Sequence, residues 1–437
     1  MSPISRHRRL ALLGLPVVLL LCAACSTKGY PNTTFEGSTD LNRAIDSLWD
    51  LLLLLGTVVF VLVEAWLIYT IVRYRRRGDA RPEQVHGNTT LEIAWTVLPA
   101  LVLAIIAVPT VRTIFQTQAK VNPGALQVEV IGHQWWWEFR YPELGVVTAN
   151  ELYLPVGRTV NFALKSKDVL HSFWIPRFGG KRDLITNHTN YIWFTPDSSL
   201  AVNGQCAEFC GASHADMRFR VVTLPPADFA AWAAHQKSPS VGSAPAAPVP
   251  ALPAATPVVT ASMAGGAQVA GIGTSPTAPN TAADTAADTA ADMALASAST
   301  WAGPGPLPDY YIPKTPIPAG LGMPNGLVGD AARGKQIYSI NSCIGCHVVT
   351  GNPSSMGIIG PNLTHLGTRS TIAAGLYPND AKHLFAWIKN ARAMKPGVLM
   401  PTLGTGQYDP IMKTTAKAGS LSDQQIADIV AYLLSLK

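Results

Sequence analysis

Twelve residues near the middle of the chain, CAEFCGASHADM at 206–217, bring together Cys206, Cys210, His214 and Met217. Thiolate, imidazole and thioether ligands select copper, and two thiolates on one loop can bridge two copper ions that share one electron. Such a site needs a second imidazole, which the sequence DVLHSF offers in His171. Two cysteines at this spacing outside the cytoplasm are otherwise more often a disulfide, so the residues alone leave both interpretations open.

A second group of chemically active residues lies nearer the C-terminus, in the sequence CIGCH at residues 343–347. This is the haem c attachment motif, in which Cys343 and Cys346 form thioethers with the haem vinyl groups. His347 follows at the spacing that lets its imidazole reach the iron. A helix expected at residues 329–340 and a capped helix at the end of the chain support the motif, because five residues alone can match by chance.

Residues 326–437 resemble the class I cytochromes c, in which the sixth iron ligand is a methionine in a loop before the last helix. The resemblance implies that Met400, within KPGVLMP at 395–401, is this ligand. The competing residues are Met394, Met412, His365 and His383. A methionine paired with a histidine raises the haem potential, which suits the delivery of electrons to copper.

Residues 40–225 resemble subunit II of the haem–copper oxidases, a family with two membrane-spanning helices and a cupredoxin-like domain. The resemblance is carried by four stretches: LEIAWTVLPA (91–100), GHQWWWEFRYP (132–142), DVLHSFWIPRFGGK (168–181), and GQCAEFCG with the histidine and methionine that follow it. It implies a dinuclear copper site whose side-chain ligands are His171, Cys206, Cys210, His214 and Met217. Glu208 would bind copper through its backbone carbonyl, which leaves its carboxylate to reach a magnesium ion shared with the catalytic subunit.

The same resemblance implies roles for two further residues, Trp135 and Glu92. Trp135 corresponds to the aromatic position where electrons enter, whereas Trp136 and Trp137 are interpreted as ordinary strand aromatics. Glu92, at the start of the second apolar stretch, corresponds to a position that feeds a proton path into the catalytic subunit. A carboxylate at a helix start also interacts favourably with the helix dipole, and both interpretations of Glu92 stay open.

The elements that must position these residues begin with two apolar stretches. Residues 51–72 and 93–111 are each long enough to cross a hydrocarbon core of about 30 Å. The loop between them, residues 73–92, holds five arginines. Positively charged loops stay in the cytoplasm, so everything after the second span is expected outside. Glu64 lies within the first span, where an ionisable group is costly, and we expect it to face a polar patch of a neighbouring subunit.

The first 25 residues have the pattern of a signal peptide, with a basic start, an apolar stretch and a small-residue end. The sequence CAAC before Ser26 resembles a lipoprotein signal in which Cys25 becomes lipidated. Cleavage without lipid and a retained anchor stay open as alternatives. Together with the arginine-rich loop, this pattern indicates a multi-pass protein of a bacterial inner membrane, with the copper and haem domains on the periplasmic side.

The remaining chain divides by composition. Alternating apolar residues from Leu126 predict a β domain over 118–236. Residues 237–325, rich in Ala, Pro and Thr, are predicted to be a disordered linker because they offer little apolar surface to bury. Ser422 and Gln425 form a capping box for a helix in the last domain, residues 326–437. We therefore expect a multidomain membrane protein: a two-helix transmembrane hairpin, a cupredoxin-like β-sandwich, a disordered linker and an all-α cytochrome c domain.

These features favour an oxidase subunit over two alternative functions. In the favoured interpretation electrons pass from a soluble donor, a cytochrome c or the quinol-oxidising complex, to haem c and then to copper. They continue through Trp135 to a catalytic subunit I, which reduces oxygen and pumps protons beside subunit III. A tethered electron carrier is disfavoured because it needs one anchor, whereas a nitric oxide reductase of the same architecture stays open. The net charge of +6 is not gathered into a basic stripe, which argues against nucleic acid.

Overall fold

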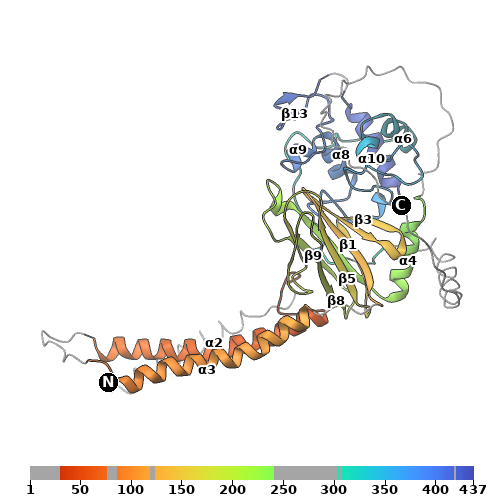
Figure 1. The fold of residues 1–437 in the computed structure, drawn as a ribbon. Coiled ribbons are helices and arrows are strands. Elements are labelled where there is room, and N and C mark those ends of the chain that lie inside the picture. Colours follow the sequence, from red (N-terminus) through yellow and green to blue (C-terminus); the bar gives the residue numbers. More distant parts are fainter. Residues whose placement is uncertain (1–29, 76–85, 119–123, 241–302, 306, 418–419) are drawn as a thin grey trace, which may run out of the picture.

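The computed structural model describes residues 30–75, 86–118, 124–240, 303–305, 307–417 and 420–437. The signal-peptide pattern, half of the arginine-rich loop and the central part of the expected linker lie outside the described residues. Figure 1 shows three parts: a long helical hairpin, a β domain above its end, and a mainly helical domain that packs on the opposite side of the β domain.

The hairpin consists of α2 (Asp40–Arg73) and α3 (Thr89–Thr117), both longer than the expected spans. Their long apolar stretches are uncovered by the rest of the chain, as in helices that face lipid. The hydroxyl of Thr39 caps α2 by accepting from the N–H of Asn42, and it also donates to the carbonyl of Phe178 in the β domain. The first turn of α2 is therefore anchored to the β domain.

The β domain is a sandwich of two five-stranded sheets, with orders β3-β2-β1-β5-β8 and β4-β10-β9-β6-β7. The strands are β1 (Leu126–His133), β2 (Trp136–Tyr141), β3 (Val146–Ala149), β4 (Glu151–Pro155), β5 (Val160–Ser166), β6 (His171–Trp174), β7 (Arg182–Leu184), β8 (Asn190–Phe194), β9 (Ala201–Cys206) and β10 (Arg218–Leu224). The alternation of apolar residues from Leu126 onwards is confirmed, because Leu126, Val128 and Val130 are all buried.

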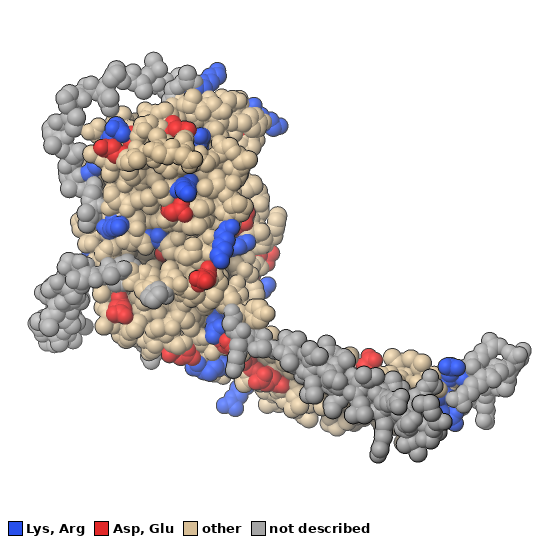
Figure 2. Space-filling view, turned by 180° about the vertical axis from the view of Figure 1, so that it is seen from behind, with Lys and Arg blue, Asp and Glu red and all other residues tan. Residues whose placement is uncertain are grey.

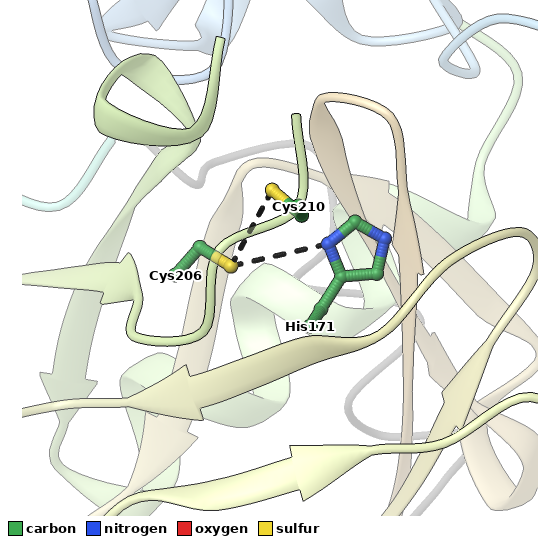
Figure 3. Close-up of side chains that lie close together, drawn as sticks. All are labelled: His171, Cys206 and Cys210. Atoms are coloured by element: carbon green, nitrogen blue, oxygen red, sulfur yellow. Dashed lines mark hydrogen bonds between the residues drawn. The ribbon is translucent and has the colours of Figure 1, made fainter. Parts of the chain in front are cut away.

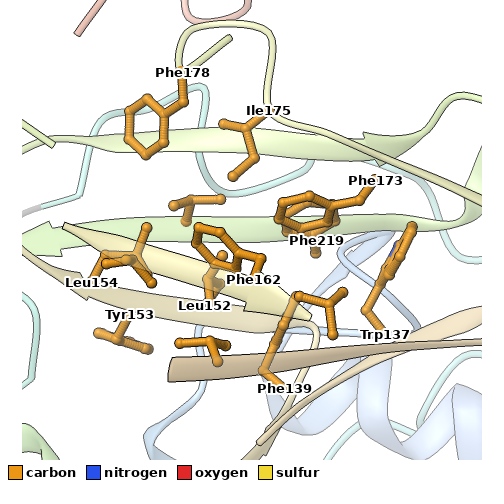
Figure 4. Close-up of a cluster of buried hydrophobic side chains, with 14 of the residues drawn as sticks. Trp137, Phe139, Leu152, Tyr153, Leu154, Phe162, Phe173, Ile175, Phe178 and Phe219 are labelled. Carbon is orange, nitrogen blue, oxygen red and sulfur yellow. The ribbon is translucent and has the colours of Figure 1, made fainter. Parts of the chain in front are cut away.

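Large aromatic side chains fill the space between the two sheets (Figure 4). Phe173 and Phe219 stack face to face with ring centroids 5.1 Å apart, and Trp137 meets Phe219 edge-on at 5.3 Å. Aromatic pairs in these geometries stabilise a core beyond their buried area. This rigid core underlies one end of the sandwich, where Trp137 also approaches His171.

The last part of the expected linker, residues 237–325, is packed in the structure. The expected domain over 118–236 ends in α4 (Pro226–Lys237), and the described residues from 303 onwards pack on the protein. Tyr311 is fully buried in the core of the β domain, and Leu321 is buried in that of the last domain. A few large apolar side chains thus order a segment whose average composition predicted disorder. The central part of the expected linker, residues 241–302, lies outside the described residues.

The last domain packs helices around a second core. Its elements are α6 (Ala331–Ile340), α7 (Cys343–Cys346), α8 (Ala381–Lys389), α9 (Ala391–Met394), α10 (Asp423–Ser435), β11 (Thr371–Ile372), β12 (Tyr377–Pro378), β13 (Tyr408–Asp409) and β14 (Thr414–Thr415). The predicted capping box of Ser422 and Gln425 is confirmed at the start of α10. Asp428, buried on α10, accepts hydrogen bonds from Arg333 on α6 and joins the two helices.

The surface seen from behind carries charged side chains singly and in small groups on a mostly uncharged background (Figure 2). Basic side chains lie at the end of the hairpin far from the β domain, where α2 ends with Arg73. Apart from the linker boundary, the expected fold class is confirmed: two apolar helices, a β-sandwich and a mainly helical C-terminal domain.

Candidate functional site

The predicted copper ligands converge at one end of the sandwich. His171 begins β6, Cys206 ends β9, and the loop from β9 to β10 brings Cys210, His214 and Met217 back over them. The sulfurs of Cys206 and Cys210 lie 3.8 Å apart, and Cys206 Sγ lies 3.9 Å from His171 Nδ1 (Figure 3). Cys210 Sγ lies 3.6 Å from His214 Nδ1 and 3.7 Å from Met217 Sδ.

The spacing of these atoms tests the two interpretations of the cysteine pair. A disulfide needs sulfurs about 2.05 Å apart, so 3.8 Å shows two free cysteines. Metal–ligand bonds of about 2.0–2.3 Å place neighbouring donor atoms of a tetrahedral site roughly 3.3–3.8 Å apart, close to what is seen here. The carbonyl oxygen of Glu208 lies 3.2 Å from Cys206 Sγ and adds a sixth donor. The residues present therefore fit a soft metal such as copper.

The site also favours thiolate over thiol at one sulfur. Hydrogen bonding from Cys210, and further contacts with His171 and two backbone groups, lower the pKa of Cys206. The same contact with Cys206, together with burial, raises the pKa of Cys210. A thiolate is the form that binds a metal, so the pair is prepared for a cation whose charge would stabilise both sulfurs as thiolates.

Side chains behind the ligands fix the orientation of His171. Its Nε2 lies 2.8 Å from the carboxylate of Asp168, which leaves Nδ1 directed at the sulfurs. Although burial opposes the effect, this contact raises the pKa of His171 and lowers that of Asp168. Gly132 on β1 provides the room for the ring, because a Cβ there would lie 2.7 Å from it. Outer partners of this kind set the affinity of metal sites.

The haem attachment motif lines an apolar cavity of about 470 Å³ in the last domain. Cys343 and Cys346 lie on the single turn of α7, and His347 follows it. The Nδ1 of His347 donates to the carbonyl of Pro361 at 2.8 Å, which leaves Nε2 unprotonated and able to bind iron. Burial lowers the pKa of His347 and favours this neutral form. The volume, the apolar lining and the motif all fit haem c.

Among the described residues that line the cavity, Met400 is the one methionine and His347 the one histidine. The competitors lie elsewhere. Met394 is buried in the core, and Met412 is exposed at the surface. His365 contacts the carbonyl of Ser238, and His383 pairs with Asp380 at the start of α8. Met400 is therefore the candidate with access to the haem cavity.

Trp135 lies where the two sites meet. Its indole N–H donates to the carbonyl of Cys210 at 3.0 Å, and the same residue lines the haem cavity with Gln134 and Trp136. The indole therefore stands between the haem cavity and the loop that carries Cys210.

Two carboxylates belong to the helical hairpin. The carboxylate of Glu92 reaches back to the N–H of Asn88, the N-cap of α3, as a helix-start carboxylate does. Glu64 lies within the apolar stretch of α2, as the sequence indicated.

Several residues of the site were missed by sequence reasoning. Asp168 lies in the quoted stretch DVLHSF, and its position three residues before His171 was the available signal. Trp137, interpreted as an ordinary strand aromatic, is buried and donates to the carbonyl of Met217 at 3.4 Å. Trp136, interpreted in the same way, stacks on His133 and lines the haem cavity. Lys395 and Ser213, which join the two domains, carried no signal in the sequence.

Comparison with protein families identifies three segments. Residues 33–113 match the family described as cytochrome c oxidase subunit II, transmembrane domain. Residues 146–224 match the periplasmic domain of the same subunit, and this range contains the cysteines and histidines of the candidate copper site. Residues 331–437 match the family described as cytochrome c, and this range contains the haem motif.

Whole-length relatives agree with these matches. The chain is 30% identical over 387 residues to cytochrome c oxidase subunit 2 of Alkalihalophilus pseudofirmus, covering 87% of this chain and 83% of the relative. It is 28% identical over 456 residues to cytochrome c oxidase subunit 2 of Bacillus subtilis, covering 99% and 98%. A solved periplasmic domain of subunit II of cytochrome oxidase from Bradyrhizobium japonicum is 28% identical, covering 27% of this chain and 97% of that one, with a TM-score of 0.26.

Proposed function

The chain belongs to the cytochrome c oxidase subunit II family, and on this premise we propose that it carries electrons through haem c and a dinuclear copper site to an oxygen-reducing catalytic subunit. Haem iron and copper bound at the two sites each supply a centre that accepts and releases one electron. The observation that supports this function best is that Trp135 contacts the copper loop and lines the haem cavity.

The donor atoms support a pair of metal ions rather than one. The two cysteine sulfurs occupy the middle of the site, with His171 and the Glu208 carbonyl beside Cys206, and with His214 and Met217 beside Cys210. Each half thus offers one imidazole and one weak ligand, and the two sulfurs would serve both ions. Bridging thiolates allow one electron to be delocalised over two copper ions, which lowers the cost of rearranging the site when it is reduced.

The chain's own residues prepare both sites for this role. His347 and Met400 would hold the haem iron, and Cys343 and Cys346 would attach the haem covalently. Asp168 holds the His171 ring, and the aromatic core beneath keeps the copper loop in place.

The remaining roles follow from family membership. The hairpin of α2 and α3 would dock against catalytic subunit I, with subunit III in the same complex, in the inner membrane of a bacterium. The copper and haem domains would lie on the periplasmic side and receive electrons from a cytochrome c or the quinol-oxidising complex. Glu92 would feed a proton path, and the carboxylate of Glu208 would reach a magnesium ion shared with subunit I.

Electron paramagnetic resonance of the purified complex tests the copper assignment. We expect hyperfine splitting from two equivalent copper nuclei that share one unpaired electron. A four-line spectrum from a single copper ion would show that the thiolates do not bridge a pair. The measurement needs the copper pair oxidised, because two reduced copper ions have no unpaired electron.

A further inference from the structure

The two redox domains meet at a buried lysine. Lys395, between α9 and the Met400 loop, is 1% exposed, and its Nζ donates to three backbone carbonyls. Two belong to the copper domain, that of Trp135 at 2.7 Å and that of Asp216 at 2.9 Å. The third is that of Ala373, in its own domain, at 3.2 Å. An ammonium has three hydrogens to donate, so these carbonyls match its full capacity.

The two residues after Lys395 extend the same contact. The hydroxyl of Ser213, next to His214, donates to the carbonyl of Pro396. Gly397 has φ +81° and lies so close to the indole of Trp135 that a Cβ would stand 2.7 Å from its ring. Lys395–Gly397 therefore fill the space between the Trp135 turn and the copper loop. Three residues later the chain reaches Met400, which lines the haem cavity.

Two further buried charged residues, Glu151 and Arg220, also join the domains at another part of the interface. Glu151 and Arg220 are neighbours in the paired strands β4 and β10. The Glu151 carboxylate accepts from the N–H of Ser370 at 2.8 Å and from its hydroxyl at 2.6 Å. Arg220 donates through Nη2 to the carbonyl of Gly375 at 2.8 Å. Buried charged groups with complete hydrogen bonds specify one geometry, because a shifted partner would leave them unsatisfied.

We propose that Lys395 is a positioning residue for electron transfer, which locks the haem domain onto the copper domain so that the two sites work as a fixed pair. This inference rests on the proposed function, in which haem and copper are successive carriers. One electron passes from reduced haem to oxidised copper, no atom is transferred, and the external donor then returns an electron to the haem. The haem domain is thus a docked component of the electron path, not a carrier that swings on its linker.

The chemistry of the contact explains why a lysine is needed. Burial lowers the pKa of Lys395 to about 7, and only the protonated form can donate to all three carbonyls at once. An apolar side chain of similar length would fill the space but leave three inward carbonyls without a donor. Buried carbonyls without a donor are costly, which would shift the segment or undock the domains.

Flash photoreduction of the haem by a ruthenium dye tests the inference in the intact oxidase complex. In Lys395→Met we expect haem-to-copper transfer to slow roughly tenfold or more, because small misplacements of reacting groups are costly. The haem spectrum, the copper resonance and the onward step from copper to oxygen should stay parental. Lys389→Met is the matched control: Lys389 pairs with Asp423 inside the haem domain, and we expect its transfer rate to be unchanged.

The results of this experiment distinguish failure of the positioning role from failure of the proposed function. Parental transfer in Lys395→Met would overturn the positioning role while the proposed function stands. If the parent itself shows no transfer from haem to copper, the proposed function fails and this inference fails with it. The parent also supplies a test without a variant. A transfer rate independent of added sucrose supports fixed docking, whereas a rate that falls with viscosity would show a mobile domain and overturn it.

Discussion

The indole of Trp135 donates a hydrogen bond to the carbonyl of Cys210, so an aromatic ring at the wall of the haem cavity is bonded to the backbone of a copper ligand. Gln134 donates to the same carbonyl at 2.7 Å and holds the turn in place. The two redox sites therefore share one short stretch of structure. Their separation is set by packing within the folded chain.

Asp168 should control copper affinity through His171. We expect Asp168→Asn to weaken copper binding roughly tenfold to a hundredfold, because loss of the carboxylate frees the imidazole and lowers its basicity. A copper titration against a competing chelator measures the change. Asp183→Asn, in the neighbouring strand β7, is the control and should bind like the parent. Equal affinity in Asp168→Asn would show that the core alone orients the ring.

Met400 should be the sixth iron ligand. In Met400→Ala the haem should stay covalently attached through Cys343 and Cys346, while the iron becomes high-spin or open to carbon monoxide. Absorption spectra with and without carbon monoxide measure this. Met412→Ala, at an exposed methionine of the same domain, should leave the spectrum unchanged. A parental spectrum in Met400→Ala would mean that another residue binds the iron.

Acid should destabilise the chain through His365. Burial, with smaller contributions from His235 and Arg369, lowers the pKa of His365 from 6.5 to about 4. The unfolded chain therefore takes up a proton at higher pH than the folded chain. The stabilising contribution is present above pH 6.5 and is lost as the pH falls towards 4, which amounts to about 3 kcal/mol.

Thermal unfolding at pH 7 and pH 4.5 checks this sign. The drop in Tm between the two should be smaller in His365→Gln than in the parent, with His235 accounting for part of what remains because burial also lowers its pKa. An undiminished drop in His365→Gln would show that other groups govern the acid response.

The local elements were predictable because their signals lie in neighbouring residues. Ser422 and Gln425 are three positions apart and cap α10, and the apolar residues behind them recur with the helical period. Likewise, the copper and haem motifs depend on spacing within single loops. The start of α2 at Asp40 lies before the expected apolar span of 51–72, and Thr39, which caps it, is fixed by a contact with Phe178 far away in sequence.

The contact between the domains was not predictable from such patterns. Lys395 bonds to backbone carbonyls, and any residue supplies a carbonyl, so no residue type marks its partners. Tyr311 follows a long stretch of small residues, and its burial depends on contacts with residues far away in sequence, including Arg220 of the β domain. The place of Trp135 between the haem cavity and the Cys210 loop follows from this docking.

In the proposed path, electrons reach oxygen through the haem and then the copper site. Cys210→Ser should block this path, because a hydroxyl cannot replace a thiolate as a soft copper ligand. Ala215→Ser adds the same hydroxyl at an exposed position of the same loop and serves as the control. In membranes supplied with donor, haem c reduction and oxygen uptake are recorded together. We expect Cys210→Ser to leave the haem almost fully reduced while oxygen uptake falls to the background of other oxidases. Oxygen uptake at the parental rate would contradict the proposed path.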